Sequence, residues 1–335
     1  MKCRDLTKGN ITGQLIAFAL PLLVGALIQQ LYSTVDMMFV GKVLGTNAAA
    51  AVGSSSLIVN CVVGFFTGLS VGVGVITGQS AGSGNNERLS RVIHCAAGIT
   101  LLMGTGFTVL GVALAPMLLQ WMDVPPAILP EAVLYIRIYF CSILSIISYN
   151  VGTGILKALG DSRTPTIYQL IGGVIGNYLF IVILGLGVAG AALTTLLSQT
   201  LAAGLTISRL LRLPESYRLS VRSISLDGKL CKEILGLGIP SAIQSVMVSF
   251  SNVMIQTSIN SLDVLSIAAF TAYYKVENII YYPIMAVGQA CSAFVSQNIG
   301  AGKTNRAKEG TNKAVLLGIA ITLCTSATVL LNAQT

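Results

Sequence analysis

One polar phrase punctuated by glycines occurs twice in this chain: GQSAGSGNNER at residues 78–88 and SQNIGAGKTNR at residues 296–306. Each copy follows a long apolar run. When Gln79 is aligned with Gln297, the two glycines of the GxG and the final arginine of the two copies coincide at a constant offset of 218 residues. The phrase therefore indicates that the surrounding chain is duplicated.

The same offset extends upstream of the phrase. It pairs Leu44 with Leu262, and Pro21 pairs with Pro240 one residue out of register. We therefore predict an N-terminal unit of six helices at 1–208, a linker at 209–232 and a partial second unit at 233–335. Because the first unit has an even number of helices, both units begin on the same side of the membrane, as in transporters built from parallel repeats. The second unit stops three helices short, so we expect nine of twelve helices, as in a truncated chain.

The composition places this duplicated chain in a membrane. Of its 335 residues, 54% are hydrophobic and only 10% are charged, with a mean hydropathy of +0.80. Soluble domains carry about 25% charged residues. The 35 glycines agree, because glycine is frequent in transmembrane helices. The fold class predicted is an all-α, polytopic membrane protein.

Nine apolar runs are long enough to cross a bilayer, which takes about 20 residues in a helix. They cover 12–40, 48–78, 92–119, 131–156, 164–184, 187–208, 233–260, 264–295 and 313–332. Seventeen of the twenty lysines and arginines fall before the first run or in alternate loops on the same side. Cytoplasmic loops keep Lys and Arg, so we expect a multi-pass protein of the cell membrane with a cytoplasmic N-terminus.

Four stretches together resemble the multidrug and toxic compound extrusion (MATE) transporters over the whole chain. They are PLLVGALIQQLYSTVDMMFVG at 21–41, GTGILKALGDSRTP at 152–165, GVAGAALTTLLSQ at 187–199, and the repeated phrase. The resemblance implies a cation-coupled exporter of organic, often cationic, compounds that alternates access between two lobes. We interpret the KALGDSRTP motif and the repeated phrase as structural turns at the cytoplasmic side.

Asp36 is the main candidate for ion coupling. A carboxylate inside a membrane segment is costly, and it usually faces a cavity or an ion path. Gln29, Tyr32 and Asp36 recur at helical spacing, which predicts one polar face. The resemblance maps the coupling aspartate of the N-terminal lobe to Asp36, and Pro21 is the predicted helix bend.

Two further cation ligands, Asn177 and Thr195, follow from the resemblance. Many relatives carry a second carboxylate where this chain has Asn177, so the site has less negative charge for Na⁺. Hard cations prefer oxygen ligands, and Asp36, Asn177 and Thr195 supply three. Coupling to Na⁺ and coupling to H⁺ through Asp36 alone both remain open. We expect no other metal and no cofactor, since the cysteines show no metal-binding spacing.

Lys275 and Glu277 lie in the apolar run TAYYKVENIIYYP at 271–283. Residues two apart on a helix point to different faces, and charges at membrane depth need a partner or a watery cavity. We predict that both residues line the substrate cavity of the second unit. A structural ion pair or snorkelling to the interface is the alternative.

Two other functions remain open, and one class is excluded. A lipid-linked oligosaccharide flippase shares this architecture, and a chain without its last three helices could fail to transport alone. An enzyme is excluded, since the one histidine, His94, lies near a segment end and no GxSxG or HExxH motif occurs. The expected partners are small organic substrates and the lipid bilayer, with no nucleic acid, and the expected transporter is monomeric.

Overall fold

A computed structural model describes residues 5–43, 45–122, 124–182, 187–260 and 264–332. Within these ranges some side chains are outside the description: those of 31–54, 56–57, 177–182, 187–188, 191, 260, 264–269, 271–272, 275–276, 279, 329–330 and 332. The described chain is all-helical and contains ten α-helices and one short 3₁₀ helix. The predicted fold class is confirmed.

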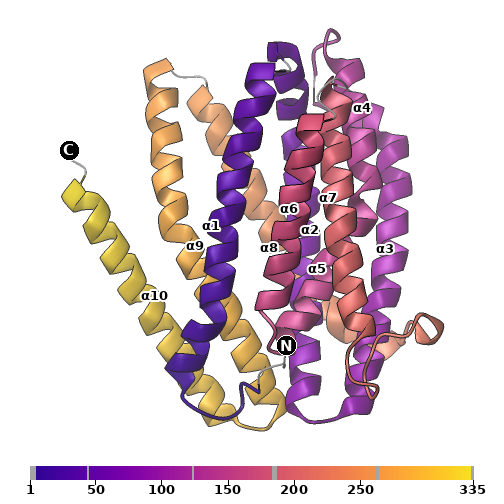
Figure 1. Cartoon of the computed structure of the whole chain (residues 1–335), viewed down its shortest axis with the longest axis vertical. Coiled ribbons are helices and arrows are strands. Elements are labelled where there is room, and N and C mark those ends of the chain that lie inside the picture. The colour runs from indigo at the N-terminus through magenta and orange to yellow at the C-terminus, as the bar shows by residue number, and fades with distance from the viewer. Residues whose placement is uncertain (1–4, 44, 123, 183–186, 261–263, 333–335) are drawn as a thin grey trace.

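The helices follow the order of the apolar runs (Figure 1). Their bounds are α1 Ile11–Val43, α2 Gly45–Gly82, α3 Asn86–Trp121, α4 Leu129–Cys141, α5 Ile143–Ala158, α6 Arg163–Val182, α7 Gly187–Leu211, η2 Val221–Ser223, α8 Gly228–Asn260, α9 Val264–Gly300 and α10 Thr304–Asn332. Several helices extend into polar sequence that the apolar runs did not include. The helix α10, for example, begins at Thr304 instead of 313, because hydropathy marks the part of a helix that contacts lipid and not its full length.

The fourth predicted segment is broken into two helices. The pair α4 and α5 is bent by 42° at Ser142, whose hydroxyl donates to the Tyr139 carbonyl at 2.6 Å. Among the described residues, four stretches are long and apolar enough to cross a membrane: Ile11–Gln30, Ile58–Gly82, Asn86–Trp121 and Gly228–Ile259. The bent pair adds a fifth when it is counted as one span.

Packing joins helices from both sides of the predicted linker. Among the described residues, the most extensive contact between two helices is that of α2 with α8. The helix α9 packs against α1, α2 and α10. One apolar cluster fills the space among α2, α3, α4 and α5, and a second joins α1 to α9 and α10. The division into units at 1–208 and 233–335 stays a prediction, and α1 contacts helices on both sides of it.

Small residues permit the contact between α2 and α8. A Cβ on Gly68 would overlap the backbone of Ala242, and one on Gly72 would lie 2.5 Å from the Gly238 nitrogen. The two backbones therefore approach each other directly. Interfaces between membrane helices are enriched in small residues for this reason.

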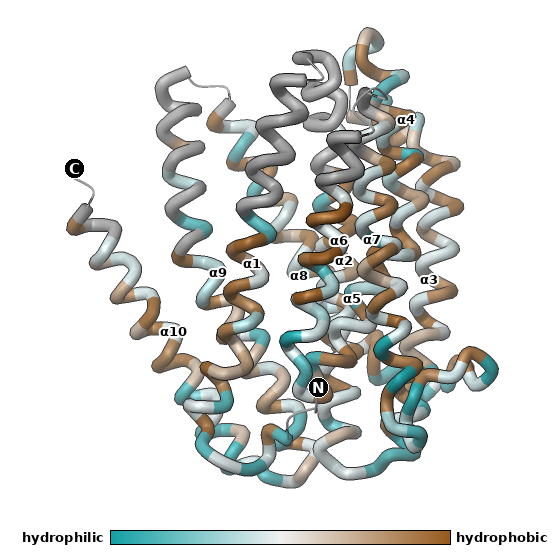
Figure 2. The backbone as a smooth tube through the Cα atoms, in the orientation of Figure 1, coloured by the Kyte–Doolittle hydropathy of each residue, from teal (hydrophilic) through white to brown (hydrophobic). Residues whose placement is uncertain are grey.

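Polar sequence gathers at one end of the bundle, which we call the basic end. Figure 2 shows hydrophilic residues along the loops at the bottom of the view, where α2 joins α3, α9 joins α10, and the chain passes from α7 to α8. Large apolar side chains are exposed along the outer faces of α3, α8 and α10, including Leu102, Met247 and Leu316. An apolar exterior around a helical bundle is suited to lipid.

The segment between α7 and α8 is anchored at the basic end by His94 and Cys95 of α3. The Ser220 amide donates to His94 Nε2 at 3.0 Å, while His94 Nδ1 lies 2.7 Å from the Ser90 carbonyl oxygen. With Nε2 accepting, Nδ1 carries the proton. His94 is buried and holds the segment, which favours a structural role over proton transfer.

Cys95 and Cys231 give this anchoring a direct test. Their sulfur atoms lie 3.2 Å apart, and Cys231 is in the first turn of α8. We expect mild oxidation with diamide to join them into a disulfide while Cys141 and Cys324, which are exposed, remain unpaired. Peptide mass spectrometry after alkylation measures the pairing. An absence of the Cys95–Cys231 cross-link under conditions that oxidise exposed thiols would contradict this placement of α8 against α3.

Candidate functional site

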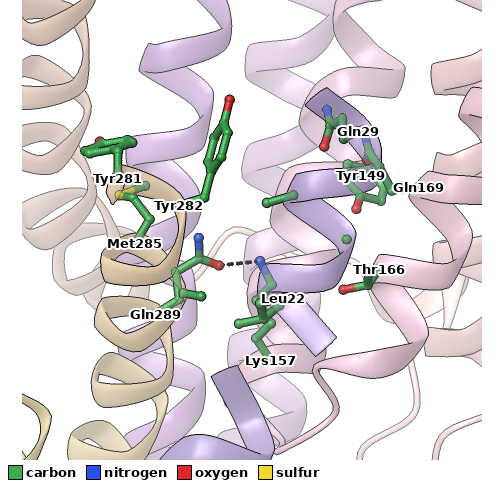
Figure 3. A pocket seen from close by; sticks show the side chains of 13 residues that line it. Leu22, Gln29, Tyr149, Lys157, Thr166, Gln169, Tyr281, Tyr282, Met285 and Gln289 are labelled. Carbon is green, nitrogen blue, oxygen red and sulfur yellow. Dashed lines mark hydrogen bonds between the residues drawn. The ribbon is translucent and has the colours of Figure 1, made fainter. Parts of the chain in front are cut away.

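A polar cavity of about 240 Å³ lies between α1, α5, α6 and α9 (Figure 3). Thirteen described residues line it: Leu22, Gly25, Ala26, Gln29, Tyr149, Lys157, Thr166, Gln169, Tyr281, Tyr282, Met285, Ala286 and Gln289. Three of the four helices precede the predicted linker and α9 follows it. The cavity therefore lies where the two predicted units meet, which is where repeat transporters hold their substrates.

Two hydrogen bonds connect α9 to the first seven helices at this cavity. Lys157 Nζ on α5 donates to Gln289 Oε1 at 2.7 Å, and Figure 3 shows this bond spanning the space between the two helices. The Tyr282 hydroxyl donates to Gln30 Oε1 of α1 at 2.6 Å. A change in the position of α9 relative to α1 and α5 must break or remake both bonds.

The cavity wall mixes polar groups with apolar ones, and its one charged lining residue among those described is Lys157. None of the thirteen described lining residues is acidic. On α6, the side-chain oxygen of Gln169 is buried and has no hydrogen-bond partner within the described part of the chain. Buried polar atoms without partners are rare in native proteins. The wall thus offers one cation to the cavity, and Gln169 beside it holds an acceptor whose hydrogen-bonding capacity is unmet.

Gly25 sets the distance between α1 and α6 on one side of the cavity. A Cβ at this position would overlap the Thr166 side chain. Because α1 lies this close to α6, Gly25 and Gln29, which are one helical turn apart, both face the cavity. Pro21 lies one turn earlier, within the uninterrupted helix α1.

The repeated phrase closes the basic end. A Cβ on Gly82 would overlap the Gln297 carbonyl oxygen, and a Cβ on Gly300 would overlap the Gln79 carbonyl oxygen. The end of α2 and the end of α9 are therefore in direct backbone contact. The contact is reciprocal, because the first glycine of the GxG in each copy of the phrase packs against the glutamine of the other copy. We call this contact the interlock.

The interlock refines our interpretation of the phrase as a pair of turns. Within the phrase, the glycines with a positive φ are Gly84 and Gly302, at 69° and 71°, and these two are the turn residues. Such backbone angles are accessible to glycine at little cost. Gly82 and Gly300 are instead contact residues between helices. A pattern in one sequence does not distinguish the two uses, because contact across the bundle depends on the tertiary arrangement.

Gln297 links the interlock to the N-terminal segment and to α5. Its Oε1 accepts from the Leu6 amide at 2.9 Å, and its Nε2 donates to the Ala158 carbonyl at 2.7 Å. Ala158 directly follows Lys157, and Gln297 is 4% exposed. The floor of the cavity and the interlock are thus joined through two consecutive residues of α5.

The KALGDSRTP motif forms the turn that we predicted. Gly160 has a φ of 90°, and Asp161 accepts from the Thr164 amide at 3.0 Å and from its hydroxyl at 2.6 Å. Asp161 therefore caps the start of α6. Arg209 lies 3.8 Å from the Asp161 carboxylate, which ties α7 to the same turn.

The predicted site residues fall into three groups. Gln29 lines the cavity. Thr195 is partly buried on α7 and Glu277 is exposed on α9, and neither is among the thirteen lining residues. The side chains of Asp36, Tyr32, Asn177 and Lys275 lie outside the described residues, so their roles stay predictions.

The sequence interpretation missed Lys157 as a site residue. As the first residue of KALGDSRTP, it belongs by sequence to the turn predicted after the apolar run 131–156. It lies instead in the last turn of α5 with its ammonium group at the cavity. One available signal was the spacing: Tyr149, Thr153 and Lys157 recur every four residues, which places all three on one face of a helix.

A bundle of long apolar helices around a polar cavity, with an internal repeat closing one end, defines a polytopic membrane transport protein. The chain belongs to the MatE family, whose sequence profile matches residues 21–183 and 240–335. This is a family of transporters and not of enzymes.

Relatives and solved structures agree with this assignment. The probable multidrug resistance proteins YpnP and YoeA of Bacillus subtilis are 31% and 30% identical, over 91% and 90% of this chain and 69% and 68% of their own length. The FAD transporter of Shewanella oneidensis is 25% identical over 88% of this chain and 67% of its own. An outward-facing multidrug resistance MATE transporter superposes with a TM-score of 0.91 at 24% identity, covering all of this chain and 75% of that one.

Proposed function

We propose that the chain is a secondary transporter that exports organic compounds in exchange for inward movement of H⁺ or Na⁺. The observation that carries this proposal is the polar cavity between α1, α5, α6 and α9, together with the interlock beneath it. Such an arrangement holds a small molecule at the junction of two units while one end is closed. The names of YpnP and YoeA, both probable multidrug resistance proteins, support export as the direction.

Coupling requires that the driving cation favours one state of the transporter over the other. We propose Asp36, Asn177 and Thr195 as the cation ligands. We further propose that Pro21 allows α1 to bend as the state changes, since a proline removes one hydrogen bond from the helix that contains it. The Tyr282–Gln30 bond then reports the position of α1 relative to α9.

Proteoliposomes containing the purified chain test this function. We expect at least one of three dyes, the cation ethidium, an uncharged dye or an anionic dye, to accumulate against its gradient when either a proton gradient or a sodium gradient is imposed, and to equilibrate when both are absent. Imposing the two gradients separately identifies the coupling ion. Protein-free liposomes provide the leak rate. Ethidium transport that never exceeds this rate under either gradient, repeated with at least one uncharged and one anionic dye, would refute the proposal for this chain.

A further inference from the structure

We propose that Lys157 forms an anion-binding subsite, and that the compounds held in the cavity carry a carboxylate or phosphate group on an aromatic framework. This inference rests on the proposed function for the term "substrate", although binding itself does not require transport. It departs from the expectation that the substrates are often cationic. Three features of the cavity carry it.

The first feature is the placement of the charge. Lys157 is half-buried. A charge that is partly removed from water is costly unless it is paired or hydrogen-bonded. In the described part of the chain Lys157 has one polar contact, with the neutral side chain of Gln289. An ammonium group has three N–H donors. One is used by Gln289, which leaves two donors and a full positive charge for a bound molecule.

The second feature is the absence of a competing acid on the described wall. The thirteen described lining residues contribute amides, hydroxyls and apolar groups besides Lys157, but no carboxylate. A cationic group on a ligand would meet like charge here, whereas an anionic group would gain a charge-assisted hydrogen bond.

The third feature is the aromatic rim and the size of the cavity. Tyr149, Tyr281 and Tyr282 line the space, and Figure 3 shows Tyr282 rising beside the gap above the Lys157–Gln289 bond. Tyrosine rings offer broad apolar faces to a planar molecule. Drug-sized ligand pockets measure roughly 300–1,000 Å³, and about 240 Å³ is small for a lipid-linked saccharide. A small aromatic anion fits these dimensions.

Three fluorescent naphthalenes that share one ring system and carry a small anionic, neutral or cationic group at the same position test the subsite: 2-naphthoate, 2-naphthylmethanol and 2-naphthylmethylammonium. Binding to the full chain in nanodiscs is measured by fluorescence anisotropy. Because a charge-assisted hydrogen bond is about twice as strong as a neutral one, we expect 2-naphthoate to bind at least about tenfold more tightly than the alcohol, and the ammonium compound to bind least.

Substitutions assign that preference to Lys157. Lys157→Gln should reduce the preference for naphthoate over the alcohol to about onefold, while Lys157→Arg should keep it. Lys313→Gln is the matched control, since it removes the same charge from a surface residue paired with Glu309 at 2.7 Å. A circular dichroism spectrum and a single gel-filtration peak that match those of the unmodified chain show that each variant is folded.

Gln289→Glu keeps the test decisive if Lys157→Gln does not fold. A carboxylate at this position would pair with Lys157 and occupy its charge, so the naphthoate preference should again fall about tenfold. A preference for naphthoate that survives both substitutions, or a stronger binding of the ammonium compound to the unmodified chain, overturns the subsite. The naphthalene affinities are measured in nanodiscs and do not depend on transport in the proteoliposomes. Failure of the proposed function and failure of the subsite are therefore distinguishable.

Discussion

Replacing Gly300 with valine is expected to open the basic end of the transporter and to reduce export by about tenfold or more. An added Cβ would overlap the Gln79 carbonyl, which belongs to the backbone of α2 and cannot move aside by changing a rotamer. Overpacking of this kind costs about 1–3 kcal/mol, and 1.4 kcal/mol is a tenfold change in an equilibrium. The cost falls on the state in which the interlock is made. A state in which α2 and α9 separate at this end escapes that cost, so we expect the population to shift toward it.

Labelling measures this shift directly. Ser296 is 3% exposed within the interlock, and a cysteine placed there reacts with a maleimide only when the basic end opens. We expect Gly300→Val to raise the labelling rate at residue 296 by about tenfold or more, as quantified by mass spectrometry. The companion substitution Gly82→Val should act in the same way, because Gly82 meets Gln297 across the interlock.

Gly288→Val is the control on the same helix. Gly288 also lies in α9, but an added Cβ there meets no atom within 4 Å. It should leave both labelling and export near those of the unmodified chain. Equal labelling and equal export in Gly300→Val and Gly288→Val would show that the interlock is not the part of the molecule that opens.

Asp36→Asn is expected to abolish ion-coupled export while leaving the protein folded. Gly25 and Gln29 of α1 line the cavity, and Asp36 lies seven residues, or two helical turns, beyond Gln29. Helical periodicity therefore predicts that Asp36 lies on the same stripe of α1. Asparagine retains the size and an oxygen ligand but neither titrates nor carries charge, so binding of the cation no longer favours one state.

Concentrative transport separates coupling from binding. In proteoliposomes with an imposed proton or sodium gradient, Asp36→Asn should lose accumulation of the substrate entirely. It should keep binding of 2-naphthylmethanol, which shows that the cavity is intact. The matched control is Glu131→Gln, which removes a carboxylate from an exposed position in the first turn of α4. Accumulation by Asp36→Asn at the rate of the unmodified chain would remove Asp36 from the coupling mechanism.

The sequence by itself determined the class of the molecule and its helices. Both depend on local properties of the chain. The length of an apolar run decides whether a helix can cross a bilayer. Gly160, Asp161 and Pro165 favour the turn at 160–165. The helix positions were predictable for the same reason. Their ends were less so, since α10 begins nine residues before its apolar run, and the break at Ser142 leaves the apolar run around it uninterrupted.

The tertiary structure alone decided which of these residues meet. The sequence predicted Gly82 and Gly300 to be turn residues, but they are contact residues between two helices and lie 218 residues apart. It placed Lys157 in the motif predicted to form a turn, but in the structure Lys157 donates to Gln289 of α9. Contacts between distant segments depend on how helices pack, and many packings satisfy one pattern of hydropathy. The sequence therefore predicted a polar face on α1. It did not predict that the Lys157 ammonium lies at the same cavity, because that depends on how α5 and α9 pack.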